Sequence, residues 1–350
     1  MEEKRKIYSK DAIVSDRRSL RAVVIITSTT VFFLSLISLC VGRYNISLSQ
    51  VMEVIVPKCF IPDVKIDDVT YNVIINLRLP RIIVAILIGG ALSLSGITFQ
   101  GIFKNPLVSP DILGVSSGAC VGAAIAILLG QNIYGIQILA FIFGIVTVAI
   151  TMLIPRIMKR DSTIMLVLSG VIVSGFMSSV LGFIKYIANP ETQLADITYW
   201  QLGSIAKVTY GSLLKTAPII IIAASILICL RWRINILSLG DNEARSLGVN
   251  LRIEKGLAVL CATILTASSV CISGTIGWIG LVMPHLARMV VGNNNVRCLP
   301  VATIMSGGFL LIIDTLARTI SVGEIPLGIL TGLIGTPFFA WMLIKQKMES

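Results

Sequence analysis

The chain has 350 residues, of which 55% are hydrophobic and only 13% are charged, and its formal net charge is +11. A soluble chain carries about a quarter of its residues as charged side chains, so this composition excludes an ordinary soluble domain. The 29 glycines and the long apolar runs favour packed transmembrane helices over a β-barrel. The positive charge lies in short segments between apolar runs, which indicates membrane topology and not nucleic-acid binding.

About 20 apolar residues cross the core of a bilayer. By that measure the sequence predicts an all-α, polytopic membrane protein with ten transmembrane helices in a single domain over residues 1–350. The predicted spans are 20–41, 78–102, 112–130, 134–154, 163–186, 212–230, 256–275, 277–293, 300–320 and 326–344. The first span is too long for a secretory signal and lacks a small-residue cleavage site, so we expect it to be retained.

The distribution of Lys and Arg predicts the orientation of the chain. If the N-terminus lies inside and the spans alternate, twenty of the 29 Lys and Arg residues fall on the inner side. Short cytoplasmic segments collect Lys and Arg, so we expect both termini in the cytoplasm and residues 1–19 as a cytoplasmic N-terminal segment. The predicted location is the cell membrane.

Two arginines, Arg78 and Arg81, stand at the outer mouth of the second span in "LRLPRIIVAILIGG". They oppose the positive-inside bias, and the simplest interpretation from the residues alone is that they snorkel to lipid headgroups. Pro80 between them fits the first turn of a helix and predicts that the helix begins there. In the ninth span, Asp314 and Arg318 have the spacing of an ion pair on one helix.

The longest inner connection, residues 231–255, is amphipathic and predicts either a docking platform for a partner or a helix lying on lipid. Five of its apolar side chains could bury against another surface: Leu237, Leu239, Ala244, Leu247 and Val249. Asp241, Glu243 and Arg245 are expected to stay free. The outer segment 42–77 is long and acidic, and the sequence assigns it no role.

Two Gly- and Pro-rich stretches interrupt the apolar runs. The stretch "NPLVSPDILGVSSGA" begins at Asn105 and Pro106, and Gln100 lies shortly before it. These three residues could border a translocation path. Alternatively, Asn105 could simply cap a helix. In "GEIPLGILTGLIGTP", three glycines near one face permit close approach of another helix, within the chain or from a second copy. These glycines are Gly328, Gly332 and Gly335.

Several chemistries are disfavoured. The seven cysteines show no CxxC spacing and the one histidine, His285, is expected to be structural, so we predict no metal centre, no cofactor and no catalytic residues. The sequence has no P-loop and no G-x-S-x-G motif, which argues against ATP binding by this chain and against an intramembrane hydrolase. An ion-coupled secondary transporter stays open, although only Asp314 could carry the ion.

Five motifs occur in order, from "LRLPR" and "NPLVSPDILGVSSGA" through "LSLGDNEARSLGVN" and "SGTIGWIGLVMPHLAR" to "GEIPLGILTGLIGTP". From about Leu20 to the C-terminus the chain resembles the FecCD family, the membrane permeases of bacterial ABC importers for iron–siderophore, haem and cobalamin. The resemblance implies a fold like that of the cobalamin-importer permease (type II ABC importer), with ten helices per subunit. It also implies a second permease subunit, identical or different, two cytoplasmic ABC ATPase subunits and an extracytoplasmic binding protein.

The resemblance further implies roles for particular residues. Arg78, Arg81 and Arg318 would face acidic residues of the binding protein. The segment 237–250 would seat in the ATPase, with contacts from Leu239, Gly240, Asp241, Glu243, Ala244, Arg245, Leu247 and Gly248. ATP hydrolysis would reside on the partner, so this chain is not expected to be an enzyme. The implied cargo is a ferric siderophore, with haem or cobalamin as the alternative.

Overall fold

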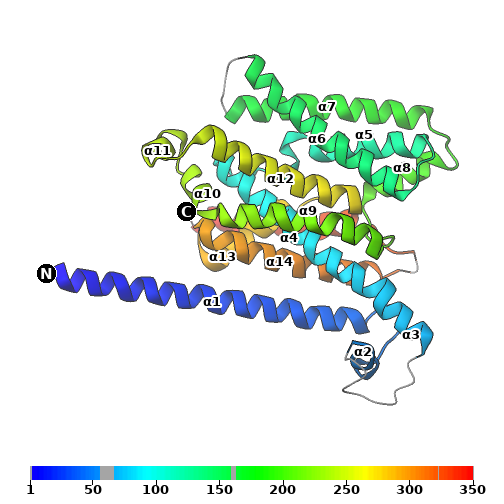
Figure 1. The fold of residues 1–350 in the computed structure, drawn as a ribbon, viewed down its shortest axis with the longest axis horizontal. Helices are drawn as coiled ribbons and strands as arrows, with labels where there is room; N and C mark the ends of the chain where they lie inside the picture. Colours follow the sequence, from blue (N-terminus) through cyan, green and yellow to red (C-terminus); the bar gives the residue numbers. More distant parts are fainter. Residues whose placement is uncertain (1, 56–66, 159–162, 322, 350) are drawn as a thin grey trace.

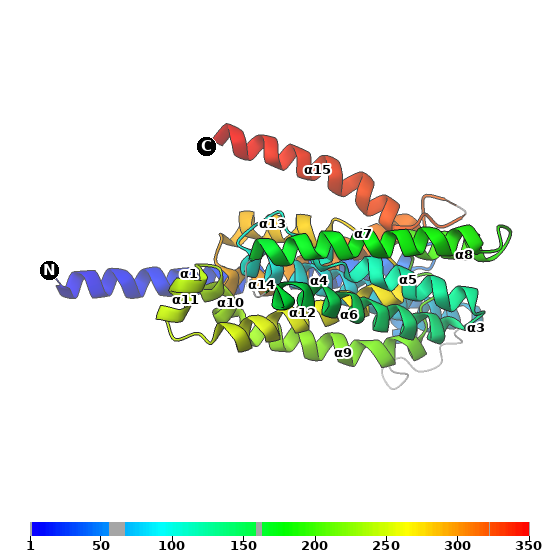
Figure 2. The same cartoon turned by 90° about the horizontal axis from the view of Figure 1, so that it is seen from above.

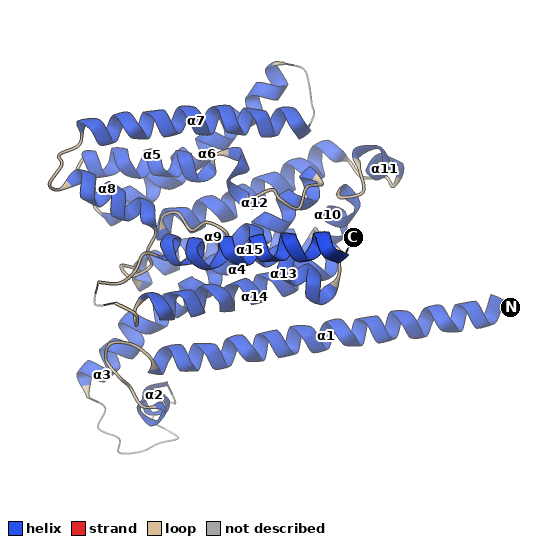
Figure 3. Ribbon diagram, turned by 180° about the vertical axis from the view of Figure 1, so that it is seen from behind, coloured by secondary structure: helices blue, strands red, loops and turns tan. Residues whose placement is uncertain are grey.

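The computed structural model describes residues 2–55, 67–158, 163–321 and 323–349. Within these ranges all regular secondary structure is helical and no strand occurs (Figure 3), as the sequence predicted. Asp63 of the acidic outer segment and the inner basic residues Lys159 and Arg160 lie outside the described residues.

Ten apolar helices correspond one to one with the ten predicted spans. They are α1 (Glu2–Cys40), α4 (Leu79–Phe103), α5 (Val115–Leu128), α6 (Ile133–Ile157), α7 (Thr163–Ile187), α9 (Tyr210–Cys229), α12 (Leu251–Ser273), α13 (Ile279–Val291), α14 (Asn295–Ala317) and α15 (Leu327–Glu349). Seven of the described helices are long and apolar enough to cross a membrane, and α5, α13 and α15 supply shorter apolar stretches.

Short helices cover the two ends of this bundle. They are α2 (Leu48–Ile55), α3 (Asp68–Asn72), a π-helical turn (Val73–Arg78), a 3-10 turn (Pro110–Leu113), α8 (Gln193–Leu202), α10 (Arg231–Leu237) and α11 (Asp241–Ser246). Both chain termini lie at the same end as α10 and α11, whereas α2, α3 and α8 lie at the opposite end (Figures 1 and 3). The predicted inner loop and the two termini therefore share one end of the molecule.

The second predicted span begins well before Pro80. Its helix starts at Asp68 of α3, passes through the π-helical turn and continues as α4. In that turn the N–H of Leu79 bonds to the carbonyl of Ile74, five residues back. The predicted place of Pro80 in the first turn of a helix is confirmed for α4, which begins at Leu79. The α3 helix and the π-helical turn that extend this helix back to Asp68 were not predicted.

Helix α4 is the centre of the bundle, and its small residues explain how it fits there. It packs against α9, α12, α13 and α14. A Cβ placed on Gly89 would lie 2.3 Å from the carbonyl oxygen of Ser306, and one on Gly96 would lie 1.9 Å from that of Gly280. Only glycine permits these two backbone contacts, which is the usual way for apolar helices to pack closely in a membrane.

Helix α15 stands partly apart from the other helices (Figure 2). Its N-terminal end packs against the body of the molecule, and its C-terminal part leans away from the other helices (Figure 2). Large apolar side chains such as Leu333 and Ile344 are exposed along it. Apolar side chains on the outer helices, including Phe32 of α1 and Phe176 of α7, are exposed as well, as expected for surfaces that face lipid or another subunit.

Candidate functional site

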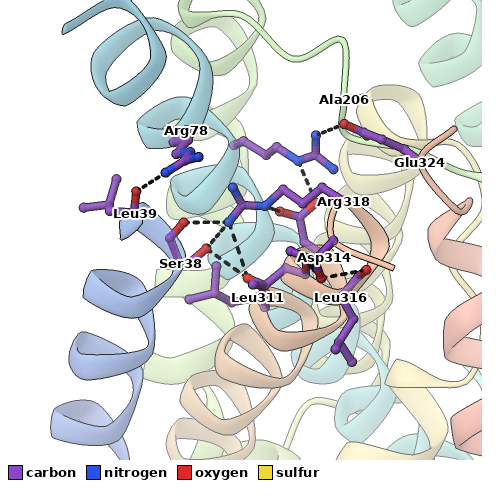
Figure 4. Close-up of polar contacts among 12 residues, drawn as sticks. Ser38, Leu39, Arg78, Ala206, Leu311, Asp314, Leu316, Arg318 and Glu324 are labelled. Atoms are coloured by element: carbon purple, nitrogen blue, oxygen red, sulfur yellow. Dashed lines mark hydrogen bonds and ion pairs between the residues drawn. The ribbon is translucent and has the colours of Figure 1, made fainter. Parts of the chain in front are cut away.

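Three arginines and two carboxylates gather where α1 and α14 end and α4 begins (Figure 4). We call Arg78, Arg81, Asp314, Arg318 and Glu324 the outer arginine cluster. Arg81 donates from Nε to Oδ1 of Asp314 at 2.7 Å and from Nη1 to Oε1 of Glu324 at 3.0 Å. Nε of Arg318 lies 3.5 Å from Oδ2 of Asp314. The fully buried charge of Asp314 is thus balanced by two guanidinium groups.

Two arginines of the cluster also close the end of α1. The last turn of a helix leaves carbonyls without intrahelical donors, and its partial negative charge favours a cation. Arg318 donates to the carbonyl of Ser38 at 2.7 Å. Arg78 donates to the carbonyls of Leu39, Cys40 and Tyr44. The arginines therefore tie α1 to α4 and α14.

The cluster changes one sequence-based expectation and confirms another. Arg78, Arg81 and Arg318 are only 5%, 8% and 6% exposed. Carbonyls and carboxylates of the same chain bind all three guanidinium groups, which would be costly to bury unpaired, so snorkelling to lipid headgroups does not account for Arg78 and Arg81. Their docking to a binding protein stays a prediction. The predicted ion pair of Asp314 with Arg318 is confirmed, but Asp314 also pairs with Arg81.

The inner loop folds on an apolar cluster of its own. Ile236, Leu237, Ala244 and Val249 are buried together between α10 and α11. Gly248, which directly follows α11 and its C-cap, has a φ of +77°, the left-handed conformation that commonly ends a helix. The loop is therefore a folded projection at the end of the molecule that carries the termini.

The exposed side of this loop carries two of its five apolar side chains. Leu239 and Leu247 are 59% and 58% exposed, whereas Leu237, Ala244 and Val249 are buried within the chain. Asp241 was expected to stay free, but its carboxylate accepts hydrogen bonds from Nζ of Lys255 at 3.1 and 3.2 Å. Glu243 and Arg245 are exposed, as predicted. Two large apolar side chains thus project from a loop whose own core is already filled.

The three residues assigned to a path meet at a pocket of about 450 Å³ on the inner side. Gln100, Asn105 and Pro106 all line it, together with Arg288 and His285. Oε1 of Gln100 accepts a hydrogen bond from Arg288 at 2.7 Å, and Nε2 of His285 bonds to the carbonyl of Pro106 at 3.1 Å. Asn105 also accepts the backbone N–H of Leu107, which closes a turn between α4 and the 3-10 turn, so its side chain does not cap a helix as considered from the sequence.

The three glycines of α15 face the same chain. A Cβ on Gly328 would lie 2.6 Å from the carbonyl oxygen of Leu202, and one on Gly335 would lie 2.8 Å from Cβ of Trp278. A Cβ on Gly332 would have nothing closer than Nε1 of Trp278 at 3.9 Å. Gly328 and Gly335 are therefore needed for close packing inside the subunit, whereas Gly332 has room.

Sequence reasoning missed three residues of these sites. The sequence assigns no role to Glu324, although this residue lies only six residues beyond Arg318. The sequence predicts nothing for Arg288 beyond a positive charge, and no local pattern pairs Arg288 with Gln100. Trp278 is a non-glycine residue at φ +70° at the start of α13, where it packs against α15. Only the position of Glu324 gave a signal that could have been used.

Comparison with known proteins gives a consistent result along the chain. The model of the FecCD transport family matches residues 30–345. The chain is 40% identical over 313 residues to the molybdate import system permease protein MolB of Haemophilus influenzae, covering 89% of this chain and 92% of that protein. It is also 40% identical over 320 residues to a protein of Helicobacter pylori named probable iron chelatin transport system permease protein, covering 90% and 95%.

A solved structure has the same fold. It is described as a metal-chelate type ABC transporter in an inward-facing conformation, and it matches with a TM-score of 0.84 at 38% sequence identity. The match covers 93% of this chain and 99% of that one. The arrangement of ten apolar helices is therefore shared with a transporter permease over nearly its whole length.

Proposed function

Because this chain belongs to the FecCD transport family, we propose that it is the membrane permease of an ATP-driven importer. It works with a second permease subunit, two cytoplasmic ABC ATPase subunits and an extracytoplasmic substrate-binding protein. ATP hydrolysis resides on the ATPase subunits, and the chain itself carries out no covalent chemistry. Both of its termini are cytoplasmic.

The exposed leucines of the inner loop carry this proposal. Leu239 and Leu247 project from a loop whose core is already filled by Ala244 and its neighbours. Exposed large apolar side chains on a folded projection fit an interface with another protein. The segment from Leu239 to Gly248 lies at the end that carries both termini, so it would meet an ATPase in the cytoplasm (Figure 1).

An ion-coupled secondary transporter fits less well. Such a protein needs an intramembrane carboxylate that can bind and release an ion. Asp314 was the residue placed for this, and it is held by both Arg81 and Arg318. Because two guanidinium groups already balance the charge of this carboxylate, it has little affinity for a coupling cation.

We place docking of the binding protein at the outer arginine cluster, at the end opposite the inner loop. Arg78 and Arg318 are engaged with the end of α1. Arg81 holds a carboxylate at the outer rim, so it is the arginine best placed to meet a carboxylate of the partner. Arginine suits this task because its planar guanidinium pairs with carboxylates in a defined geometry.

A ferric siderophore is the proposed cargo. One relative at 40% identity is named for iron chelatin, and the solved neighbour is described as metal-chelate type. The relative named for molybdate is equally similar, which makes molybdate the second candidate. Haem and cobalamin, for which more distant relatives are named, are the further alternatives.

Proteoliposomes loaded with ATP and supplied externally with the binding protein and labelled cargo test this function. We expect ATP-dependent uptake of one of the four cargoes by the wild-type complex. In Ala244→Pro, the new residue lacks the N–H that donates to the carbonyl of Gly240 at 2.8 Å, so α11 should break. Its uptake should fall to the level seen without ATP, while ATP hydrolysis continues.

The matched control is Asn242→Ala, an exposed position of the same helix. It should import at the wild-type rate because it leaves the helical bonding of α11 intact. Normal uptake by Ala244→Pro would exclude the loop from coupling. Uptake by the wild-type chain that needs an ion gradient and no ATP would refute the importer function itself.

A further inference from the structure

Glu324 is the outermost carboxylate of the outer arginine cluster. It lies in the short connection between α14 and α15 (Figure 4). Its side chain is 30% exposed, whereas that of Arg81 beneath it is 10% exposed and that of Asp314 is fully buried. A carboxylate that approaches Arg81 from outside must therefore meet Glu324 first.

Glu324 is also the more loosely held of the two carboxylates. Asp314 has two ion-pair partners, Arg81 at 2.7 Å and Arg318 at 3.5 Å. Glu324 has one, Arg81, which donates to Oε1. Within the described part of the chain the buried Oε2 of Glu324, like Oδ2 of Asp314, has no hydrogen-bond partner. A buried carboxylate oxygen without a donor is unfavourable, so this side chain gives up little when it leaves.

The charge of the cluster favours an additional carboxylate. Three guanidinium groups face two carboxylates, which leaves one positive charge in excess. The hydrogen bonds of Arg78 go to the backbone carbonyls of Leu39, Cys40 and Tyr44. Such bonds satisfy donors but do not neutralise the charge, so the cluster still attracts an anion.

The backbone that directly follows Glu324 is held by two hydrogen bonds, so a movement of the side chain alone is enough to free the carboxylate. The N–H of Ile325 bonds to the carbonyl of Ala317 at 3.1 Å, and the N–H of Leu327 bonds to that of Gly203 at 2.8 Å. A change of side-chain rotamer can carry the carboxylate from Arg81 into water. No helix has to shift for the site on Arg81 to open.

We propose that Glu324 is a built-in competitor for the docking site. It occupies the carboxylate-binding position on Arg81 in the free transporter, and a carboxylate of the binding protein replaces it on docking. This inference rests on the proposed function. In the exchange Arg81 loses its ion pair with Glu324 and forms one with the partner's carboxylate. The free energy of docking therefore includes only the difference between these two ion pairs. Docking is thereby kept weak enough for the empty binding protein to leave.

The test compares the affinity of variants for the binding protein encoded with this permease, fluorescently labelled and titrated onto the complete transporter in lipid nanodiscs. Glu324→Gln keeps the shape of the side chain and removes its charge. We expect it to bind the partner about tenfold more tightly, because one competing charge is lost. Arg81→Gln should bind more weakly. The double variant Arg81→Gln with Glu324→Gln should show no gain over Arg81→Gln alone.

Glu53→Gln on α2 is the matched control, since Glu53 lies on the same outer side but outside the cluster, and its affinity should equal that of wild type. Unchanged or weaker binding by folded Glu324→Gln would overturn the inference, because a purely structural glutamate predicts that result. If Glu324→Gln does not fold, Glu324→Asp replaces it, with a shorter reach to Arg81 and the same expected direction. If the wild-type complex itself shows no saturable binding, the proposed function fails instead.

Discussion

Asp314 is the residue on which the outer arginine cluster depends. It is fully buried in α14, and it holds Arg81 from α4 and Arg318 from its own helix. A buried ion pair contributes little compared with apolar packing, but removal of one partner leaves an uncompensated charge behind. Its importance for stability therefore lies in the two arginines that would lose their counter-charge.

We predict that Asp314→Asn is strongly destabilised, by about 3–5 kcal/mol, because two guanidinium groups would stay buried with a neutral amide between them. Asp68→Asn is the matched control, since Asp68 is exposed at the start of α3 and should change stability by less than about 0.5 kcal/mol. Thermal unfolding of both variants in detergent, followed by tryptophan fluorescence, measures the difference. Equal midpoints for Asp314→Asn and wild type would show that the cluster does not need this charge.

At the scale of elements, α15 is held mainly at its N-terminal end. Leu327 bonds to the carbonyl of Gly203, and Gly328 lies against the backbone of residues 202 and 275. Farther along, Gly335 packs on Trp278, and the C-terminal part of the helix leans away from the body (Figure 2). The attachment of the helix therefore depends on close contacts at Leu327 and Gly328. It also depends on the packing of Gly335 and Phe339 on Trp278.

Two alanine substitutions on α15 separate close packing from helix propensity. The new Cβ in Gly328→Ala would lie 2.6 Å from the carbonyl oxygen of Leu202. We expect a loss of about 1–3 kcal/mol, as for other overpacked sites. Gly332→Ala, one turn later, meets nothing closer than 3.9 Å and should be neutral or gain up to about 1 kcal/mol from helix propensity. The measurements are the thermal unfolding midpoint and the uptake rate of both variants. If Gly328→Ala and Gly332→Ala give the same values, the close contact at Gly328 does not contribute to stability.

For the molecule as a whole, the ten apolar helices could be predicted from the sequence because crossing a bilayer imposes a length and composition on each local stretch. The contacts of the outer cluster could not. Arg81 and Asp314 are 233 residues apart, and no local pattern shows which helix ends will meet. The start at Asp68 was missed for another reason: a proline usually marks the first turn of a helix, and here a π-helical turn precedes it.

The inner loop shows the same limit. Its amphipathic pattern identified the residues of its core, including Leu237, Ala244 and Val249. The same pattern includes Leu239 and Leu247, and both are exposed. Hydrophobicity alone does not distinguish a side chain that is buried within the chain from one that is available to a partner. The burial of each side chain had to come from the fold.

The two ends of the molecule differ in the partners they offer, and this difference requires a defined orientation in the membrane. The inner loop and both termini lie at one end of the molecule. The outer arginine cluster lies at the opposite end, which also carries α2 and α3 (Figure 1). Twenty of the 29 Lys and Arg residues fall on the inner side in the proposed topology. From the positive-inside bias we expect the termini in the cytoplasm.

Reporter fusions test this orientation. Green fluorescent protein joined after residue 350 should fluoresce, and alkaline phosphatase at the same position should be inactive, because the C-terminus is expected in the cytoplasm. Phosphatase inserted at the exposed turn 130–132 between α5 and α6 should be active, because that turn lies at the opposite end. Loss of the inner charges by Arg231→Gln with Arg233→Gln serves as a comparison and should leave the pattern unchanged, since many other inner Lys and Arg residues remain. An active phosphatase at the C-terminus would reverse the topology, placing the inner loop outside the cell and out of reach of any ATPase.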